Sequence, residues 1–374
     1  MNKSKINKKK DIMLYLIHID WSWIKQRPQF LSYELKEYFN LTLFFPKNYR
    51  NNNIINSKTP SFVNSFYKLP FQRFKNSLIF DFLNKHFILL QLSNKLKRSK
   101  YIWLTSPEIY YLIKKKISIN HKLIYDCMDD FVEFPNIKNN VKQKKKMYTN
   151  ERDLISRADN IFSSSLHLKN ILIERYKIIP KKINVINNAI SSEYKNIEYT
   201  IAPNDYTNKV HHKDLLYIGT ISSWFDFNLI IDSLNQFKYI RYILIGPCEI
   251  DIPPHERIIH LGIKEHNTLN NYMQLSDALI MPFKVNDLVK SVNPVKLYEY
   301  IHSGKPIITC SYDEIDKFND FVFRYNNQFE FNEYLELLMK DKLSQKSKKD
   351  CNDFLYNNKW VNRTKNIIEV LHKK

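Results

Sequence analysis

Glycine is the residue that this sequence most conspicuously lacks. Its 374 residues include four glycines, far below the usual share of about 7%. Glycine is hard to replace where the backbone needs a positive φ or must approach another segment closely. All four lie in the second half, and three directly follow short apolar runs: Gly219, Gly246 and Gly262. These three indicate a binding site at the carboxyl ends of strands; ordinary strand-to-helix turns are the alternative.

Cysteines and long hydrophobic runs are also scarce. The four cysteines are widely scattered with no paired spacing, which argues against a zinc site or a disulfide framework and favours a reducing compartment. The most apolar helical stretch, 78–96, is interrupted by Asp81, Lys85 and Lys95, so we expect no spanning helix of ~18 apolar residues. The apolar stretch 12–19 is short and lacks a small-residue cleavage site, so no secretory signal is expected.

Positive charge, in contrast, is abundant. Lys and Arg total 58 against 38 Asp and Glu, a net charge of +20 at pH 7, which favours anionic partners. Segment 68–100 interleaves basic residues with five phenylalanines and is typical of an interfacial helix on anionic lipid. The alternative is a core helix with solvated lysines. The charge is scattered and no nucleic-acid module is recognisable, so we expect no nucleic-acid partner.

The hydrophobic pattern predicts an α/β protein with two domains. Short apolar runs alternate with helical stretches in both halves, which is typical of parallel sheets covered on both faces. We expect an N-terminal domain at 1–195, a polar linker at 196–213 and a C-terminal domain at 214–374, whose last helix can cross back to the first domain. Such domains bind ligands at the carboxyl ends of their strands. The strands are expected at 12–19, 41–45, 101–105, 122–125, 160–163 and 183–186, then at 215–218, 240–245, 258–261, 278–281 and 306–309.

The most informative segment is 293–306. Asn293 is a good N-cap, Pro294 a good first helical residue and Gly304 a good left-handed C-terminal residue, which predicts a helix over 294–303. Lys296 and Glu299 then share one face near its N-terminus. A helix N-terminus and a lysine attract phosphate, and a carboxylate one turn deeper can accept hydrogen bonds from a ribose diol. This pattern indicates a nucleoside-diphosphate site; an ordinary Lys–Glu surface pair is the alternative.

The same segment resembles the donor-binding helix of GT-B glycosyltransferases in glycosyltransferase family 4. Those enzymes commonly carry two glutamates separated by seven residues, followed by a Gly-x-Pro-(Val/Ile)-(Val/Ile) strand. Glu299 matches the second glutamate and 304–308 match the strand, whereas Ser291 replaces the first glutamate. Further segments resemble teichuronic-acid-type polysaccharide biosynthesis transferases in the same order along the chain: 20–29, 125–130, 219–226 and 260–283.

The resemblance implies a GT-B architecture, in which two Rossmann-like doubly wound domains face a central cleft. It implies transfer of a sugar, with retention of configuration, from a nucleoside-diphosphate sugar to a saccharide or lipid-linked acceptor of capsule, O-antigen or teichuronic-acid-like polymer. The enzyme would be cytoplasmic and peripheral on the inner face of the cell membrane. No cofactor or metal is expected beyond the donor substrate. The donor-binding residues would be Gly219, Thr220, Ser222, Gly262, Ile263, Ser291, Asn293, Pro294, Val295, Lys296 and Glu299.

Catalytic and acceptor candidates come mainly from the first half. Asp126, Asp129 and Asp130 follow or end a predicted strand and could position or deprotonate an acceptor hydroxyl, with Asp126 the first choice; helix capping or turn formation is the alternative. Lys296 would stabilise the leaving diphosphate. Arg27 either contacts phosphate or an anionic acceptor, or forms a structural ion pair, and Trp21 either stacks on a sugar or packs under its loop.

Two other functions compatible with this architecture stay open at this point. A sugar-nucleotide epimerase would share the fold, although the sequence shows no clear additional acid–base set for that reaction. A catalytically silent sugar-nucleotide-binding scaffold at the membrane is the second alternative, because Ser291 stands where the family usually has a glutamate.

Overall fold

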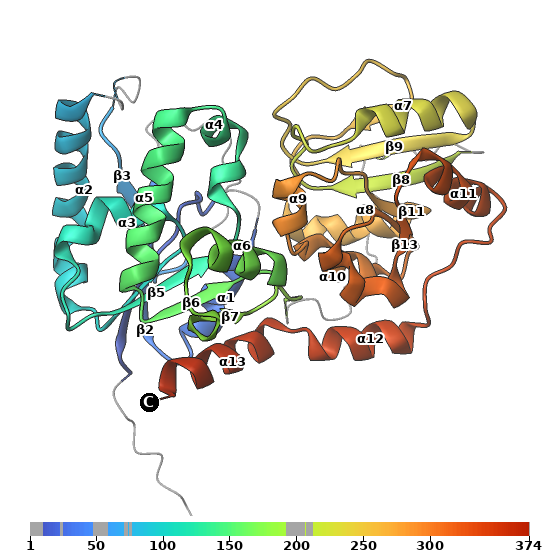
Figure 1. Ribbon diagram of the computed structural model, residues 1–374. Helices are drawn as coiled ribbons and strands as arrows, with labels where there is room; N and C mark the ends of the chain where they lie inside the picture. Colours follow the sequence, from blue (N-terminus) through green and yellow to red (C-terminus); the bar gives the residue numbers. More distant parts are fainter. Residues whose placement is uncertain are drawn as a thin grey trace, which may run out of the picture. The chain divides into compact units, whose positions relative to one another are not determined.

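The computed structural model describes residues 10–22, 25–47, 59–70, 74, 77–191, 206 and 212–373 (Figure 1). Contacts divide the chain into two compact units, Met1–Ile186 with Thr364–Lys374, and Asn187–Arg363. Most of the predicted linker 196–213 lies outside the described residues. Each unit is built around its own sheet and core, as alternating apolar strands and helices require.

Unit 1 contains a seven-stranded sheet in the order β3-β2-β1-β4-β5-β6-β7, in which neighbouring strands are parallel. Strand β4 at the centre is a wholly buried apolar run, which fits a sheet covered on both faces. The order reverses at β1 and β4, so their carboxyl ends form a switch point where ligands typically bind. The strands are β1 (Ile12–Leu16), β2 (Asn40–Lys47), β3 (Val63–Tyr67), β4 (Tyr101–Leu104), β5 (Lys122–Cys127), β6 (Asn160–Ser163) and β7 (Ile183–Val185).

The helices of unit 1 begin at the polar residues that favour helix starts. Ser106, Asn140 and Ser165 each accept a backbone N–H from the first turn of the helix that follows. The α-helices are α1 (Arg27–Leu35), α2 (Leu78–Arg98), α3 (Pro107–Ile113), α4 (Pro135–Lys138), α5 (Val141–Arg157) and α6 (Leu166–Tyr176), with 3-10 turns η2 (Lys114–Lys116), η3 (Phe131–Glu133) and η4 (Pro180–Lys182).

Unit 2 contains a six-stranded parallel sheet in the order β10-β9-β8-β11-β12-β13. Its order also reverses, here between β8 and β11. The strands are β8 (Lys213–Ile218), β9 (Ile240–Ile245), β10 (Ile258–His260), β11 (Ala278–Met281), β12 (Ile307–Cys310) and β13 (Phe323–Tyr325).

The helices of unit 2 form two groups that flank this sheet. α7 packs beside α11, whereas α10 packs beside α8 and α12 (Figure 1). The α-helices are α7 (Phe227–Gln236), α8 (Leu269–Leu275), α9 (Asp287–Ser291), α10 (Val295–Ser303), α11 (Gln328–Met339) and α12 (Lys348–Asn357), with 3-10 turns η5 (His266–Thr268) and η6 (Asp313–Phe321). The last helix, α13 (Trp360–His372), begins in unit 2 and belongs to unit 1 from Thr364 onward. The two parallel sheets flanked by helices confirm the predicted α/β class with two doubly wound units; the cleft between them stays a prediction.

Candidate active site

Three glycines lie in a row at the carboxyl ends of adjacent strands of unit 2. Gly219 directly follows β8, Gly246 follows β9, and Gly262 lies two residues beyond β10. The amide of Gly246 donates to the carbonyl oxygen of Gly262 at 2.9 Å. Gly246 has φ +139°, and a Cβ atom there would lie 2.0 Å from the carbonyl oxygen of Gly219. A side chain is therefore excluded at Gly246, and the close backbone approach expected from the sequence is real.

Helix α10 begins beside this edge of the sheet. The hydroxyl of Tyr300 accepts the amide of Ile218, the last residue of β8, at 2.8 Å, which fixes the helix next to the Gly219 turn. Gly304 ends the helix with φ +73°, as predicted. The prediction for its start was wrong by one residue, because Pro294 is the N-cap and Val295 the first helical residue. Asn293 precedes the cap and does not serve it.

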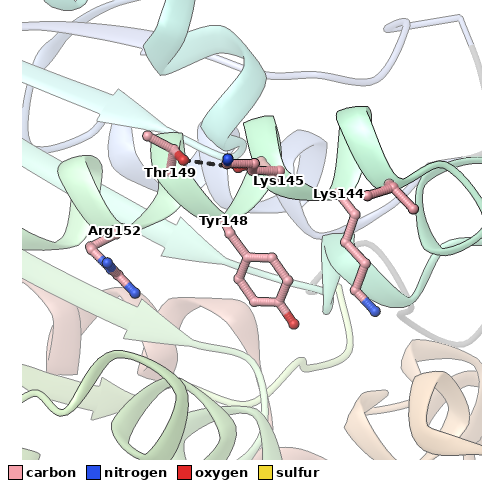
Figure 2. Close-up of a pocket in the computed structure, with 6 residues that line it drawn as sticks. Lys144, Lys145, Tyr148, Thr149 and Arg152 are labelled. Atoms are coloured by element: carbon pink, nitrogen blue, oxygen red, sulfur yellow. Dashed lines mark hydrogen bonds between the residues drawn. The ribbon is translucent and has the colours of Figure 1, made fainter.

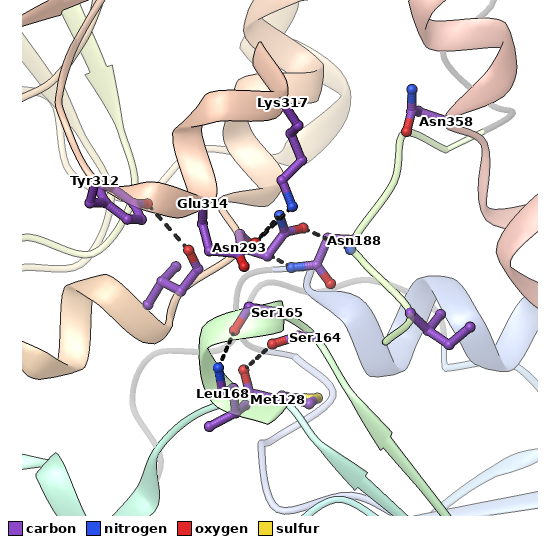
Figure 3. A network of polar contacts seen from close by, with 12 residues as sticks. Met128, Ser164, Ser165, Leu168, Asn188, Asn293, Tyr312, Glu314, Lys317 and Asn358 are labelled. Carbon is purple, nitrogen blue, oxygen red and sulfur yellow. Dashed lines mark hydrogen bonds and ion pairs between the residues drawn. The ribbon is translucent and has the colours of Figure 1, made fainter. Parts of the chain in front are cut away.

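Asn293 instead holds the chain that enters α10 (Figure 3). Its Oδ1 accepts the backbone amide of Asn188 at 2.8 Å, and its carbonyl oxygen accepts the side-chain amide of Asn188 at 2.6 Å. Its own Nδ2 donates to Glu314 at 3.4 Å, and Lys317 pairs with the same carboxylate at 2.7 Å. Asn293 is 2% exposed. Its side chain therefore positions the helix start through a buried polar network.

Glu299 lies between two basic side chains of unit 2. Lys296 Nζ lies 2.7 Å from its Oε2, and His266 Nε2 lies 3.0 Å from its Oε1. Burial of Glu299 by itself raises its pKa, but the charge of Lys296 and the hydrogen bond from His266 outweigh burial and lower the pKa to about 2. The carboxylate is thus ionised and buried, while Lys296 keeps 15% of its side chain exposed. The sequence placed Lys296 and Glu299 on one face correctly.

The other predicted donor residues differ in how far solvent reaches them. Ser222 is buried and donates to Glu249 at 2.7 Å, and Ser291 is buried and donates to the Leu288 carbonyl oxygen at 2.7 Å. Ser291 therefore closes its own short helix instead of offering a carboxylate. Pro294 is buried as well. Partly exposed positions are Gly219, Thr220, Gly262, Ile263, Val295 and Lys296.

In unit 1, Arg27 and Asp126 form a buried ion pair. Arg27 Nε lies 3.1 Å from both carboxylate oxygens of Asp126, and Arg27 Nη2 lies 2.8 Å from Oδ1. Arg27 Nη1 also donates to the carbonyl oxygen of Ile186 at 2.6 Å. Both side chains are almost fully buried, at 2% and 0% exposure. Arg27 therefore forms the structural ion pair that the sequence left open as an alternative to a phosphate or acceptor contact, and Asp126 is its partner.

The two neighbouring aspartates have contrasting environments. Asp130 is buried and accepts two hydrogen bonds from Arg175, at 2.7 and 2.6 Å. Asp129 is half-buried, and its burial together with the charge of Asp130 raises its pKa to about 6. A carboxyl group that exchanges its proton near neutral pH is suited to acid–base chemistry. Of the three aspartates, Asp129 is the one that is not buried, so its assignment to that role stays a prediction.

Trp21 follows β1 and packs under its own loop. It is 8% exposed, and its ring lies 6.0 Å from Tyr33 and 6.3 Å from Phe62 between ring centroids. Trp21 therefore packs against other side chains of the protein, which was the alternative to stacking on a sugar.

Comparison with known proteins identifies the architecture. No family model matches the chain. Over 235 residues it is 24% identical to the "Putative teichuronic acid biosynthesis glycosyltransferase TuaH" of Bacillus subtilis strain 168, a match that covers 60% of this chain and 59% of that protein. Its structure resembles sucrose-phosphate synthase from Thermosynechococcus elongatus (TM-score 0.69, 10% identity, 96% of this chain and 98% of that one). It also resembles HepE from Anabaena in complex with UDP-glucose (TM-score 0.66, 13% identity, 96% and 99%). The chain has the GT-B fold.

Sequence reasoning did not single out two histidines, one in each unit, that lie beside candidate residues of their own unit. His266 contacts Glu299, as described above. His18 follows β1, and its Nδ1 lies 2.8 Å from the Thr105 hydroxyl, while its ring meets Phe131 edge-on. Burial lowers the pKa of His18 to about 4, so its imidazole is neutral at pH 7. His266 lies five residues beyond the predicted strand 258–261, whereas His18 fell inside the predicted strand 12–19 and lies beyond the observed β1.

Among the described residues, no group of three or more His, Cys, Asp or Glu side chains is arranged to hold a metal ion. The expectation that donor binding uses a helix N-terminus and lysine instead of a metal stays a prediction.

Proposed function

We propose that this chain is a glycosyltransferase that moves a sugar from a nucleoside-diphosphate sugar to a saccharide or lipid-linked acceptor in bacterial surface polysaccharide biosynthesis. The observation that carries the proposal is the buried Glu299 carboxylate held by Lys296 and His266 beside the Gly219 turn. Similarity to TuaH and to GT-B structures, one of them in complex with UDP-glucose, supports the same activity.

The donor would occupy the carboxyl edge of unit 2. The first turn of α10 and the Gly219 turn would receive the diphosphate, because free amides and the helix dipole favour negative charge. Lys296 would move away from Glu299 and would itself contact the departing diphosphate as the glycosidic bond breaks. Glu299 would then accept the ribose hydroxyls. The lone pairs of its two oxygens allow this while His266 keeps the carboxylate in place.

The acceptor would meet the carboxyl edge of unit 1. Asp129, with its pKa of about 6, would orient or deprotonate the acceptor hydroxyl, while Asp126 and Asp130 hold the surrounding loops through Arg27 and Arg175. We retain transfer with retention of configuration as part of the proposal. In a front-face reaction the acceptor attacks from the side of the leaving diphosphate, so no second carboxylate is required as a nucleophile.

The surface of α2 supports a membrane-bound acceptor. Leu78, Ile79, Phe82 and Leu83 are each more than half exposed, although α2 buries other apolar residues further along. Lipid is the natural environment for so many exposed apolar side chains on one helix. No described helix of the protein is long and apolar enough to cross a membrane. We therefore propose that α2 lies in the interface of the inner leaflet.

A lysine cluster beside this end of α2 supports an anionic membrane. Lys85 and Lys146 lie 4.3 and 4.1 Å from the centroid of the Tyr111 ring, and Lys114 lies 5.9 Å from it. Burial, followed by the charges of Lys115 and Lys114, lowers the pKa of Lys85, and the one carboxylate that counteracts this shift, Asp81, also pairs with Lys146. Anionic phospholipid would relieve their repulsion.

A second basic surface lies along α5 (Figure 2). Lys144, Lys145, Tyr148 and Arg152 line an open groove of about 390 Å³. Its cations fit phosphate groups at the same membrane surface.

Donor binding is the step that tests the proposed function. We expect a nucleoside diphosphate to raise the thermal stability of the full chain, because a ligand that binds the folded state stabilises it. Lys296→Ala should abolish this shift and the sugar transfer. Lys290→Ala is the control. It removes the lysine of another i,i+3 ion pair of unit 2, with Asp287, and should keep both the thermal shift and the sugar transfer. Failure of all nucleoside diphosphates and their sugars to bind would reject the proposal, and binding without turnover would support the silent scaffold.

A further inference from the structure

Thr105 holds His18 at the carboxyl edge of the unit 1 sheet. His18 lies two residues beyond β1, and Thr105 directly follows β4; these are the two strands at which the sheet order reverses. The backbone amide of His18 donates to Thr105 Oγ1 at 3.1 Å, and His18 Nδ1 lies 2.8 Å from the same oxygen. The ring also meets Phe131 edge-on, at 5.1 Å between ring centroids. The orientation of the imidazole is therefore fixed.

The Thr105 hydroxyl determines which ring nitrogen of His18 carries the proton. A backbone amide can only donate, so Oγ1 accepts from it and the hydroxyl proton needs an acceptor of its own. Thr105 is fully buried, and among the described residues His18 Nδ1 is the one acceptor within reach of its hydroxyl. Nδ1 therefore accepts, and the proton of the ring lies on Nε2. Burial lowers the pKa of His18 to about 4, so the ring is neutral at pH 7.

The Nε2–H group of His18 is open to a ligand. It has no hydrogen-bond partner in the part of the chain that the structure describes, and it is not one of the fully buried unpaired polar atoms there. His18 as a whole is half-buried, so solvent contacts Nε2 while Thr105 holds the ring at Nδ1. A ligand oxygen can therefore accept from Nε2–H without displacing an existing contact of the protein.

The charges near His18 favour an uncharged ligand group. Two arginines near this edge are already held by buried carboxylates, in the pairs Arg27–Asp126 and Arg175–Asp130. Asp129, two residues before Phe131, is half-buried and has a pKa of about 6, so it is mainly ionised at pH 7. A neutral imidazole, paired arginines and a carboxylate give phosphate no net attraction, whereas a hydroxyl can accept from Nε2–H and donate to a carboxylate.

We propose that His18 Nε2–H donates a hydrogen bond to a hydroxyl or amide carbonyl oxygen of the sugar acceptor, and that this uncharged donor selects a saccharide group over a phosphate at this position. The assignment rests on the proposed function, which brings the acceptor to the carboxyl edge of unit 1. Thr105 is a positioning residue, because it acts on the acceptor only through the tautomer of His18.

NMR of the ring nitrogens tests the tautomer, on the full chain with 15N-labelled histidine at pH 7. The His18 signals are identified by their absence from His18→Gln. We expect a protonated Nε2 and an unprotonated Nδ1 in wild type. Thr105→Ser keeps the hydroxyl and should keep this tautomer, whereas Thr105→Val removes the hydroxyl and should admit the Nδ1–H tautomer. A wild-type ring protonated at Nδ1, or a Thr105→Val ring that does not change, would overturn the assignment.

Sugars and phosphate are then titrated into the same samples. The probes are the methyl glycosides of glucose, galactose and N-acetylglucosamine, with inorganic phosphate as a separate arm. We expect at least one sugar, and not phosphate, to shift the His18 Nε2 signal. His121 is the matched control in unit 1. Its Nδ1 accepts the amide of Ser118 at 2.8 Å and its Nε2 donates to the carbonyl oxygen of Leu96 at 3.1 Å, so it has the same tautomer with its donor occupied and should not respond.

Two variants of His18 separate its two nitrogens. His18→Gln offers an amide N–H in place of Nε2–H, whereas His18→Asn can keep only the contact with Thr105. By saturation-transfer NMR on the sugar, we expect His18→Gln to bind within about threefold of wild type and His18→Asn to bind about five- to tenfold more weakly, since one neutral hydrogen bond is lost.

Three further outcomes would overturn the assignment: no sugar that shifts the His18 signal, a shift caused by phosphate, or equal losses in the Gln and Asn variants. Nucleoside-diphosphate binding is measured on the same variants, and we expect it to be unchanged because Lys296 and Glu299 lie in unit 2. Its absence from wild type would reject the proposed function, whereas the His18 measurements need no donor. The two failures are therefore distinguishable.

Discussion

Lys296 Nζ lies 2.7 Å from Oε2 of Glu299, three residues later on α10. Glu299 is 2% exposed, so its carboxylate cannot be solvated and depends on Lys296 and His266 to remain ionised. Lys296 is thus the residue that couples the stability of unit 2 to its proposed donor chemistry. A bound diphosphate must compete with this buried carboxylate for the ammonium group of Lys296. The position of the ammonium group would therefore depend on the charge of the ligand.

Replacing Lys296 should expose this coupling through the pH dependence of stability. The pKa of Glu299 is about 2 in the folded chain and about 4.3 in an unfolded one, so its stabilising effect is complete above about pH 5 and is lost as pH falls toward 2. Lys296→Ala removes the main cause of the lowered pKa. We expect the free energy of unfolding to fall by about 2–3 kcal/mol at pH 7, with the difference from wild type shrinking toward pH 2–3.

Urea unfolding at pH 7, 4.5 and 3 measures this difference. Lys290→Ala is the matched control, because Lys290 and Asp287 are also an i,i+3 pair but both are exposed, 3.8 Å apart. An exposed pair contributes about 0–1 kcal/mol. A loss in Lys296→Ala that is no larger than in Lys290→Ala, or that does not change with pH, would contradict the role assigned to Glu299.

Replacement by Asn should change the free energy of unfolding in opposite directions at Asp129 and at Asp130. Asp129 has a folded pKa of about 6, above its unfolded value, so its ionisation destabilises the folded state increasingly as pH rises through 4 to 6. Asp129→Asn should therefore raise the free energy of unfolding at pH 8 by about 1 kcal/mol, with little effect near pH 4. Transfer activity should fall about 100-fold or more, as expected for loss of a general acid–base group.

Asp130→Asn provides the contrast to Asp129→Asn. It breaks the bidentate contact with Arg175 and should lower the free energy of unfolding by about 2–4 kcal/mol at neutral pH. Thermal or urea unfolding and a transfer assay on both variants check these expectations. Full activity in Asp129→Asn would remove it from the mechanism, and destabilisation by that variant at pH 8 would contradict its assigned environment.

The local parts of this architecture could be predicted from the sequence. The limits of β6, β9 and β11 match the predicted ranges, because each is a short apolar run between clear breakers. Strand β3 was not predicted, because it alternates polar and apolar residues at a sheet edge. Strand β13 contains three residues and gives too short a pattern to recognise.

In the candidate site, contacts between residues close in sequence could be predicted, whereas contacts between distant residues could not. The pairing of Lys296 with Glu299 could be predicted, since three residues along a helix fix their separation. His266 lies 33 residues from Glu299, and Arg27 lies 99 residues from Asp126. Their contacts depend on how strands are ordered in the sheets, which local spacing does not encode. Asn293 was misassigned as a cap for a similar reason: its partners, Asn188 and Glu314, are distant in sequence.

The Arg27–Asp126 pair should act mainly on stability. Removing one member of a buried pair leaves an uncompensated charge, so Arg27→Met and Asp126→Asn should each lower the free energy of unfolding by about 3–5 kcal/mol. The double variant should lose less than the sum, because neither charge then stays buried alone. Urea unfolding of the three variants measures the coupling. Two single variants with wild-type stability but no transfer activity would instead place this pair in the reaction.

Membrane binding by α2 should require both its apolar residues and anionic lipid. Phe82→Ser removes an exposed apolar side chain, and Phe329→Ser is the matched control on α11 of unit 2. In liposome flotation we expect wild type and Phe329→Ser to float with phosphatidylglycerol vesicles, and Phe82→Ser to bind about tenfold more weakly, since the lost transfer energy of one phenylalanine is about 1.5–3 kcal/mol. Binding should weaken with salt because the lysine cluster around Tyr111 contributes through charge. Equal binding to neutral phosphatidylcholine vesicles would reject the charge contribution, and equal losses in both variants would show that α2 is not the docking surface.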